Sequence, residues 1–154
     1  MLIICACLCG CGNKAPTSIA LQTVFECDFT AQYNETEILG SIAFDENGAK
    51  ITLSKPDTLC GACLEMKNGE GKISLTINGL TVEFDENRYP SAAFARLVCK
   101  AIASGGSGLQ RDDSGTLLGS IDGVGFEFTV DDSGRPQTLI IPDYSLKMSF
   151  TNYK

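Results

Sequence analysis

The sequence predicts an α+β fold that is mainly β, in which one curved antiparallel sheet is covered by one helix. Apolar and polar residues alternate with a period of two along most of the chain, a pattern typical of strands that bury one face. Short segments rich in Gly, Asn and Asp separate these runs, and a single stretch of helical period interrupts them. Because the apolar side of a single sheet has to be covered, we expect the helix to pack against it.

The predicted strands follow one another with short turns. Residues 24–33 alternate with Phe25 and Phe29 on the apolar face, and residues 38–44 do the same before the hairpin turn at 45–48. Further strands are predicted at 51–53, 60–67, 72–77, 80–84, 124–130, 139–141 and 144–150. Turns at 68–69, 78–79 and 131–134 separate several of them, which predicts a meander of antiparallel strands.

One segment after these strands has the helical period. Pro90 and Ser91 are residues suited to a helix start, and Gly105-Gly106 is suited to its end. Between them lies a broad apolar face made of Ala92, Phe94, Ala95, Val98, Cys99 and Ile102. A helix this apolar is expected to pack on the concave face of the sheet.

The first residues predict export. An apolar stretch at 2–8 leads into Leu8-Cys9-Gly10-Cys11 and then into a polar segment. This resembles the leader and lipobox of a bacterial lipoprotein, with Cys11 as the lipidated N-terminus. The predicted organisation is a signal peptide at 1–10, the lipidated Cys11 and a tether at 11–22, and a single domain at 23–154. The resemblance implies a lipid anchor in the cell membrane, with the domain on the extracytoplasmic face.

The leader has two alternative interpretations. A spanning helix needs about 20 apolar residues, and this stretch breaks at Gly10. Cys5, Cys7, Cys9 and Cys11 could instead form a metal-binding tract, because thiolates are soft ligands, but the chain offers no His or Cys pair close behind them. Lipidation is therefore the favoured interpretation.

Composition narrows the classes of partner. The 154 residues include 12 basic and 19 acidic side chains, which gives a net charge of −7. Nucleic-acid binding is disfavoured because it needs clustered Lys and Arg, which here are scattered singly. We expect a monomer with one hydrophobic core, with no cofactor and no metal.

Catalytic chemistry has few candidates. The chain contains no His, which removes the Ser-His-Asp and Cys-His arrangements, so we expect no enzyme. The candidate thiol pair is Cys60 and Cys63, whose spacing occurs in thiol-disulfide oxidoreductases when a helix follows. Here a strand pattern follows, and residues i and i+3 of a strand lie about 10 Å apart, too far for a disulfide. An oxidoreductase remains the alternative function, and a zinc site that adds Cys27 and Cys99 is a weaker one. Acidic pairs at 45–46, 85–86, 112–113 and 131–132 fit solvated turns better than calcium loops.

Two short sequences recur. Leu-Gly-Ser-Ile occurs at 39–42 and 118–121, and Phe-Asp-Glu-Asn occurs at 44–47 and 84–87. Because their spacings differ, we interpret them as similar hairpin chemistry and not as a repeat architecture.

The order of parts resembles a known family. The lipobox, the tether, the predicted curved sheet with one helix, and the segment 126–131 followed by Gly134-Arg135-Pro136 are similar to the small LolA-like exported lipoproteins of Gram-positive anaerobes. The similarity covers 24–153. It implies a half-barrel closed by a helix, with an apolar cavity that holds acyl chains in the carrier proteins.

Six apolar side chains are predicted to face the concave side of the sheet. They form either a filled core or the lining of a ligand cavity: Phe25, Phe29, Phe126, Phe128, Leu146 and Met148. The predicted function is that of a non-enzymatic, membrane-anchored protein. It would bind a hydrophobic or lipidated ligand, such as a lipid or lipopeptide, or would act as an interaction platform in the envelope.

Overall fold

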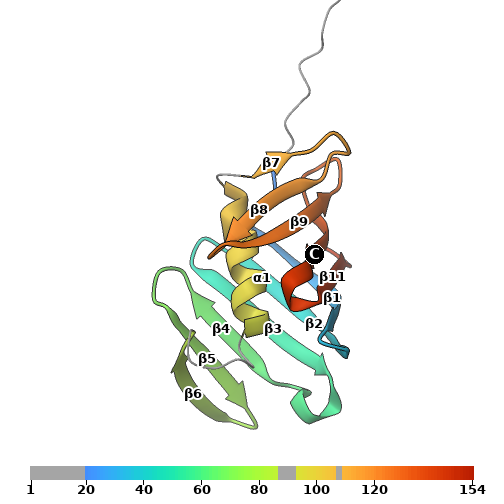
Figure 1. Cartoon of the computed structure of the whole chain (residues 1–154). Coiled ribbons are helices and arrows are strands. Elements are labelled where there is room, and N and C mark those ends of the chain that lie inside the picture. Colours follow the sequence, from blue (N-terminus) through green and yellow to red (C-terminus); the bar gives the residue numbers. More distant parts are fainter. Residues whose placement is uncertain (1–19, 87–92, 107–108) are drawn as a thin grey trace, which may run out of the picture.

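The computed structural model describes residues 20–86, 93–106 and 109–154, and their strands form one open sheet (Figure 1). Its antiparallel strands are β1 (Phe25–Tyr33), β2 (Thr36–Asp45), β3 (Gly48–Lys55), β4 (Cys63–Lys67), β5 (Lys72–Ile77), β6 (Leu80–Asp85), β7 (Gln110–Arg111), β8 (Leu117–Ile121), β9 (Val124–Val130), β10 (Pro136–Ile141) and β11 (Leu146–Thr151). Their order is β6-β5-β4-β3-β2-β1-β11-β10-β9-β8-β7. The first and last strands therefore pair at the centre of the sheet.

The helix α1 (Ala93–Ala103) lies across one face of this sheet. It contacts β3 and β4 on one side and β8 on the other, although these strands lie far apart in the sheet order. The sheet must therefore curl around the helix. The prediction of a mainly β fold with an antiparallel sheet and one helix is confirmed, and the sheet is open, not closed.

Tight turns explain the meander. Asn78-Gly79 joins β5 to β6 and Asp122-Gly123 joins β8 to β9, with φ values of 50° and 79°, and 52° and 85°. Positive φ at both central residues defines the hairpin turn whose twist matches that of the strands it joins. Asn, Asp and Gly tolerate this conformation, so these short segments fix the strand register.

Several strands differ from the sequence predictions. The strand predicted at 60–67 begins at Cys63, because a 3-10 turn at Asp57–Leu59 follows Pro56 and Gly61 has a φ of 80°. The last strand begins at Leu146, because Tyr144 belongs to a short 3-10 turn that ends at Ser145 in the left-handed region. β7 and β8 were not predicted. The predicted helix start at Pro90 and Ser91 and the four cysteines of the leader lie outside the described residues.

Two turns with the sequence Asp-Asp-Ser-Gly have the same hydrogen bonds. Asp112 Oδ1 accepts hydrogen bonds from the backbone N–H groups of Ser114 and Thr116, at 2.9 and 2.8 Å. Asp131 Oδ1 accepts those of Ser133 and Arg135, at 2.8 and 3.0 Å. The Ser114 hydroxyl also donates a hydrogen bond to Asp112 Oδ1 at 2.7 Å. This bond at Asp112 and the backbone bonds at both aspartates favour the charged carboxylates and hold their pKa values below the usual value. Both acidic pairs thus serve the turns of β7-β8 and β9-β10.

Candidate functional site

The six apolar side chains singled out from the sequence all lie in one buried cluster. Their exposed fractions range from 0% for Phe128 and Met148 to 8% for Phe25. Aromatic rings contact one another across the cluster: the centroids of Phe126 and Phe128 are 5.7 Å apart, and those of Phe29 and Phe94 are 5.9 Å apart. Phe94 comes from α1, so the helix and the sheet interdigitate there. These side chains serve as the packed core beneath the helix.

Two glycines make close packing possible in this core. Gly40 lies opposite Phe29 in the β1-β2 pair, and Gly119 lies opposite Phe126 in the β8-β9 pair. A Cβ atom at Gly119 would lie 2.2 Å from Cζ of Phe126, and one at Gly40 would lie 3.1 Å from Cζ of Phe29. Both belong to the recurring Leu-Gly-Ser-Ile sequences. Each recurrence therefore marks a place where an aromatic ring crosses over a neighbouring strand, which explains the repetition physically.

The apolar face of the sheet continues past the helix. One row of side chains crosses neighbouring strands in register, from Ile42 on β2 through Ile51, Leu64 and Leu75 to Val82 on β6. Ile42 and Ile51 are 0% and 1% exposed, Leu64 and Leu75 are partly buried, and Val82 is 59% exposed. All five side chains are aliphatic, but their exposure to water increases from β2 to β6.

We call the uncovered part the apolar wing: the helix-side face of β4, β5 and β6 formed by Leu64, Leu75, Ile77, Leu80 and Val82. Leu80 is 72% exposed and pairs with Ile77 at the end of the β5-β6 hairpin. Figure 1 shows this hairpin projecting beyond α1 at the edge of the sheet. Leu80 and Val82 therefore form a candidate contact surface. The sequence signal for it was visible in the alternation at 80–84, but sequence alone gives no sign of how far the helix reaches.

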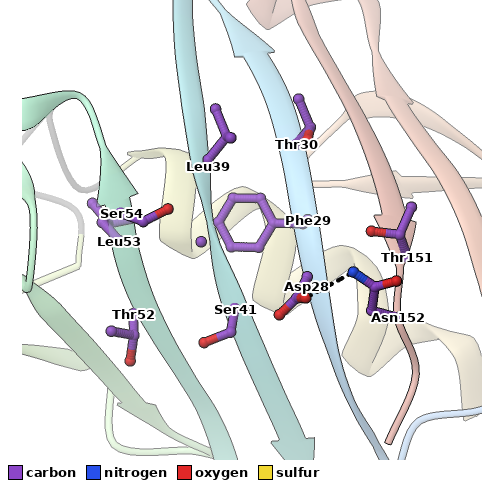
Figure 2. Close-up of a pocket in the computed structure, with 11 residues that line it drawn as sticks. Asp28, Phe29, Thr30, Leu39, Ser41, Thr52, Leu53, Ser54, Thr151 and Asn152 are labelled. Atoms are coloured by element: carbon purple, nitrogen blue, oxygen red, sulfur yellow. Dashed lines mark hydrogen bonds between the residues drawn. The ribbon is translucent and has the colours of Figure 1, made fainter.

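A hollow lies on the face of the sheet opposite the helix (Figure 2). It is an open groove of about 460 Å³ whose lining combines hydroxyl, amide and carboxylate groups with apolar surface. Asn152 Nδ2 donates a hydrogen bond to Asp28 Oδ2 at 3.0 Å within it, and the ring of Phe29 borders it at Gly40. Its described lining consists of Asp28, Phe29, Thr30, Leu39, Gly40, Ser41, Thr52, Leu53, Ser54, Thr151 and Asn152. This groove offers hydrogen-bonding groups and apolar surface side by side.

The candidate thiol pair lies at the start of β4. Cys60 is exposed in the turn before the strand, Cys63 is partly exposed on the strand, and both are free thiols. The Cys63 thiol lies 3.8 Å from Glu65 Oε1, and Glu65 in turn pairs with Lys50 at 2.9 Å. The arrangement is a strand and not the helix N-terminus that lowers a thiol pKa in redox motifs.

The other two described cysteines are buried thiols. Burial raises the pKa of Cys27 to about 11 and that of Cys99 to about 12. Tyr153 lies beside Cys27, and its hydroxyl donates a hydrogen bond to the Pro136 carbonyl. Both thiols thus act as small apolar residues of the core. Within residues 20–86, 93–106 and 109–154, no cluster of three or more Cys, Asp or Glu side chains is placed to hold a metal ion.

Comparisons with known proteins bear on the fold alone. No family model matches the sequence, and no curated protein matches it significantly. The chain is similar in structure to an uncharacterized conserved protein from Thermus thermophilus, with a TM-score of 0.51 and 14% sequence identity. The match covers 86% of this chain and 78% of that one. None of the helices in the described residues has the length and apolar character needed to cross a membrane. The architecture of an open sheet around one helix is thus shared with a solved protein.

Proposed function

We propose that this protein is a lipid-anchored, extracytoplasmic and non-enzymatic lipoprotein that binds the hydrophobic part of a ligand on its apolar wing. The ligand class is an amphiphile such as a lipid or a lipidated peptide, or an apolar segment of an envelope partner. The anchor would be Cys11, and the binding surface would be formed by β4, β5 and β6.

The observation that carries the proposal is the change in burial along the in-register row from Ile42 on β2 to Val82 on β6. Beneath the helix, Phe126, Phe128, Leu146 and Met148 fill the interior, which argues against an acyl cavity at that place. Beyond the helix, Val82 and Leu80 keep most of their surface in water. Fully burying one such side chain is worth about 1.5–3 kcal/mol, so a ligand that covers both gains appreciable affinity.

The N-terminal end of the domain lies away from the apolar wing. The Gln22 N–H donates to the Gly134 carbonyl at 2.7 Å, and Leu21 is buried against Gly105 at the end of the helix segment. These contacts hold the N-terminal end of the domain near β7, whereas the apolar wing lies at the other end of the molecule (Figure 1). A membrane anchor on this end would therefore present the wing away from the bilayer.

Binding of a long-chain fluorescent fatty acid tests this proposal. We expect Val82→Lys to weaken binding about tenfold, since a charge replaces apolar contact worth more than about 1.4 kcal/mol. The matched control is Val24→Lys, because Val24 is 51% exposed, similar to Val82, but lies outside the apolar wing. Fluorescence titration of both variants measures the effect. Equal affinities of the two variants would contradict the proposal, as would a wild-type protein that leaves the probe unbound.

A further inference from the structure

We propose that the apolar wing receives an extended peptide segment that adds as an antiparallel strand to β6, with alternating apolar and basic side chains. This inference rests on the proposed function and specifies its ligand. It follows from three observations: the open edge, the side chains on the two faces of that edge, and the charge of the protein.

The edge strand β6 has backbone groups directed away from the sheet. The sheet ends at β6 in the described part of the chain. In a two-residue hairpin, the two residues that flank the turn, here Ile77 and Leu80, exchange backbone hydrogen bonds. From this pair onward, every second residue of β6 forms its backbone hydrogen bonds with β5. Thr81 and Glu83 then direct their N–H and C=O groups outward. Thr76 Oγ1 and Thr81 Oγ1 lie 2.8 Å apart, as expected for the closely spaced side chains of a pair without backbone hydrogen bonds.

Along its described residues, this edge strand lacks three of the features that block strand addition, although it carries the charged side chains of Glu83 and Asp85. Proteins block edges with proline, bulges or very short strands. β6 has six residues without proline, and its pairing with β5 shows no register shift. The opposite edge, β7, has only two residues. An added strand would place every second side chain on the apolar wing beside Leu80 and Val82, and the others on the polar face beside Glu83.

Charge favours a basic partner at this edge. Glu83 lies on the polar face of β6, and the net charge of the protein is −7. Two β6 strands paired antiparallel about Glu83 would bring like charges directly opposite each other, which is unfavourable. A peptide that alternates valine and lysine instead places lysine near Glu83 and valine on the apolar wing.

Two backbone-methylated peptides provide the decisive test. In antiparallel pairing the lysine N–H groups of such a peptide face Thr81 and Glu83, and the valine N–H groups face away. We therefore expect the valine-lysine hexapeptide to bind the purified protein, N-methylation of its lysines to abolish binding, and N-methylation of its valines to preserve it. Equal binding of the two isomers in isothermal titration calorimetry would overturn the proposed strand pairing.

Protein variants separate this proposal from the proposed function. Thr81→Pro removes one outward N–H group and is expected to weaken peptide binding about tenfold, while binding of the fluorescent fatty acid is retained. Val82→Lys is expected to weaken both. If the fatty acid binds the wild-type protein and the peptide does not, the strand addition is wrong although the proposed function survives. If neither binds, both are wrong.

Discussion

The sheet has two arms, β8 to β11 and β4 to β6, which both place apolar side chains on the helix side but differ in how far these side chains are buried. On β8 to β11, the apolar side chains Leu117, Phe126, Phe128 and Leu139 are between 0% and 4% exposed beneath the helix. On β6, Leu80 and Val82 occupy equivalent inward positions and are 72% and 59% exposed. Apolar side chains stabilise a fold only where folding removes them from water, so the buried side chains of the first arm contribute to stability. The second arm leaves part of its apolar surface in water.

The largest expected difference between the arms is in core truncation. Phe128→Ala removes a fully buried ring that contacts Phe126, so we expect the free energy of unfolding to fall by about 3–5 kcal/mol. Urea denaturation of the purified protein measures it. A loss below about 1 kcal/mol would mean that this arm is loosely packed, against the close packing that native cores show.

A smaller effect is expected at the glycines of one hairpin. Gly119→Ala places a Cβ atom 2.2 Å from Phe126 Cζ and 2.7 Å from Leu109 Cδ2, so we expect a loss of about 1–3 kcal/mol. Gly125, on the neighbouring strand, has no atom within 4 Å of such a Cβ. Gly125→Ala is therefore the matched control and should be neutral or slightly stabilising in the same denaturation experiment. Equal losses would show that the ring does not lie over Gly119.

Alkaline pH is expected to weaken the core between the helix and the sheet, where two buried thiols lie on β1 and α1. The folded pKa of Cys27 is raised to about 11 from its ordinary value of 9.0, and that of Cys99 to about 12. Between pH 9 and the raised pKa, the unfolded chain binds fewer protons at these thiols than the folded chain does. The stability that the protonated thiols contribute is therefore fully present below pH 9 and is lost as the pH rises through the folded pKa. Denaturation at increasing pH checks this, and Cys27→Ala should reduce the dependence. A stability that rises above pH 9 would contradict the burial of these thiols.

The smallest expected effect on stability is in the apolar wing. Val82→Ser removes apolar surface that is already in contact with water, so the free energy of unfolding should change by no more than about 0.5 kcal/mol. Thermal denaturation measures the change. A loss comparable with that of Phe128→Ala would show that Val82 belongs to the folding core, and the contrast between the arms would disappear.

The sequence predicts much of the fold because strand alternation and turn chemistry are local. The strands around Phe25, Ile42 and Phe126 and the hairpin at Asn78-Gly79 follow from them. β8 was missed because Leu117, Leu118, Gly119 and Ser120 lack a clear alternation, although the Asp-Asp-Ser-Gly sequence before it matches the turn after β9. The apolar wing is a tertiary property, since it depends on where the helix ends relative to β4 and β5. Lipidation at Cys11 and the thiol chemistry of Cys60 and Cys63 stay predictions.

Methyl NMR spectroscopy tests the central claim most directly, because it distinguishes the two arms in one experiment. The protein is labelled at its Ile, Leu and Val methyl groups and titrated with the long-chain fatty acid. We expect the changes in methyl chemical shift to concentrate on the apolar wing, at Leu64, Leu75, Ile77, Leu80 and Val82. The methyl resonances of Leu139 and Ile141 beneath the helix should not change. Shifts concentrated on Leu139, Ile141 and Leu146 would instead place the ligand between the helix and the sheet, and binding on the apolar wing would be wrong.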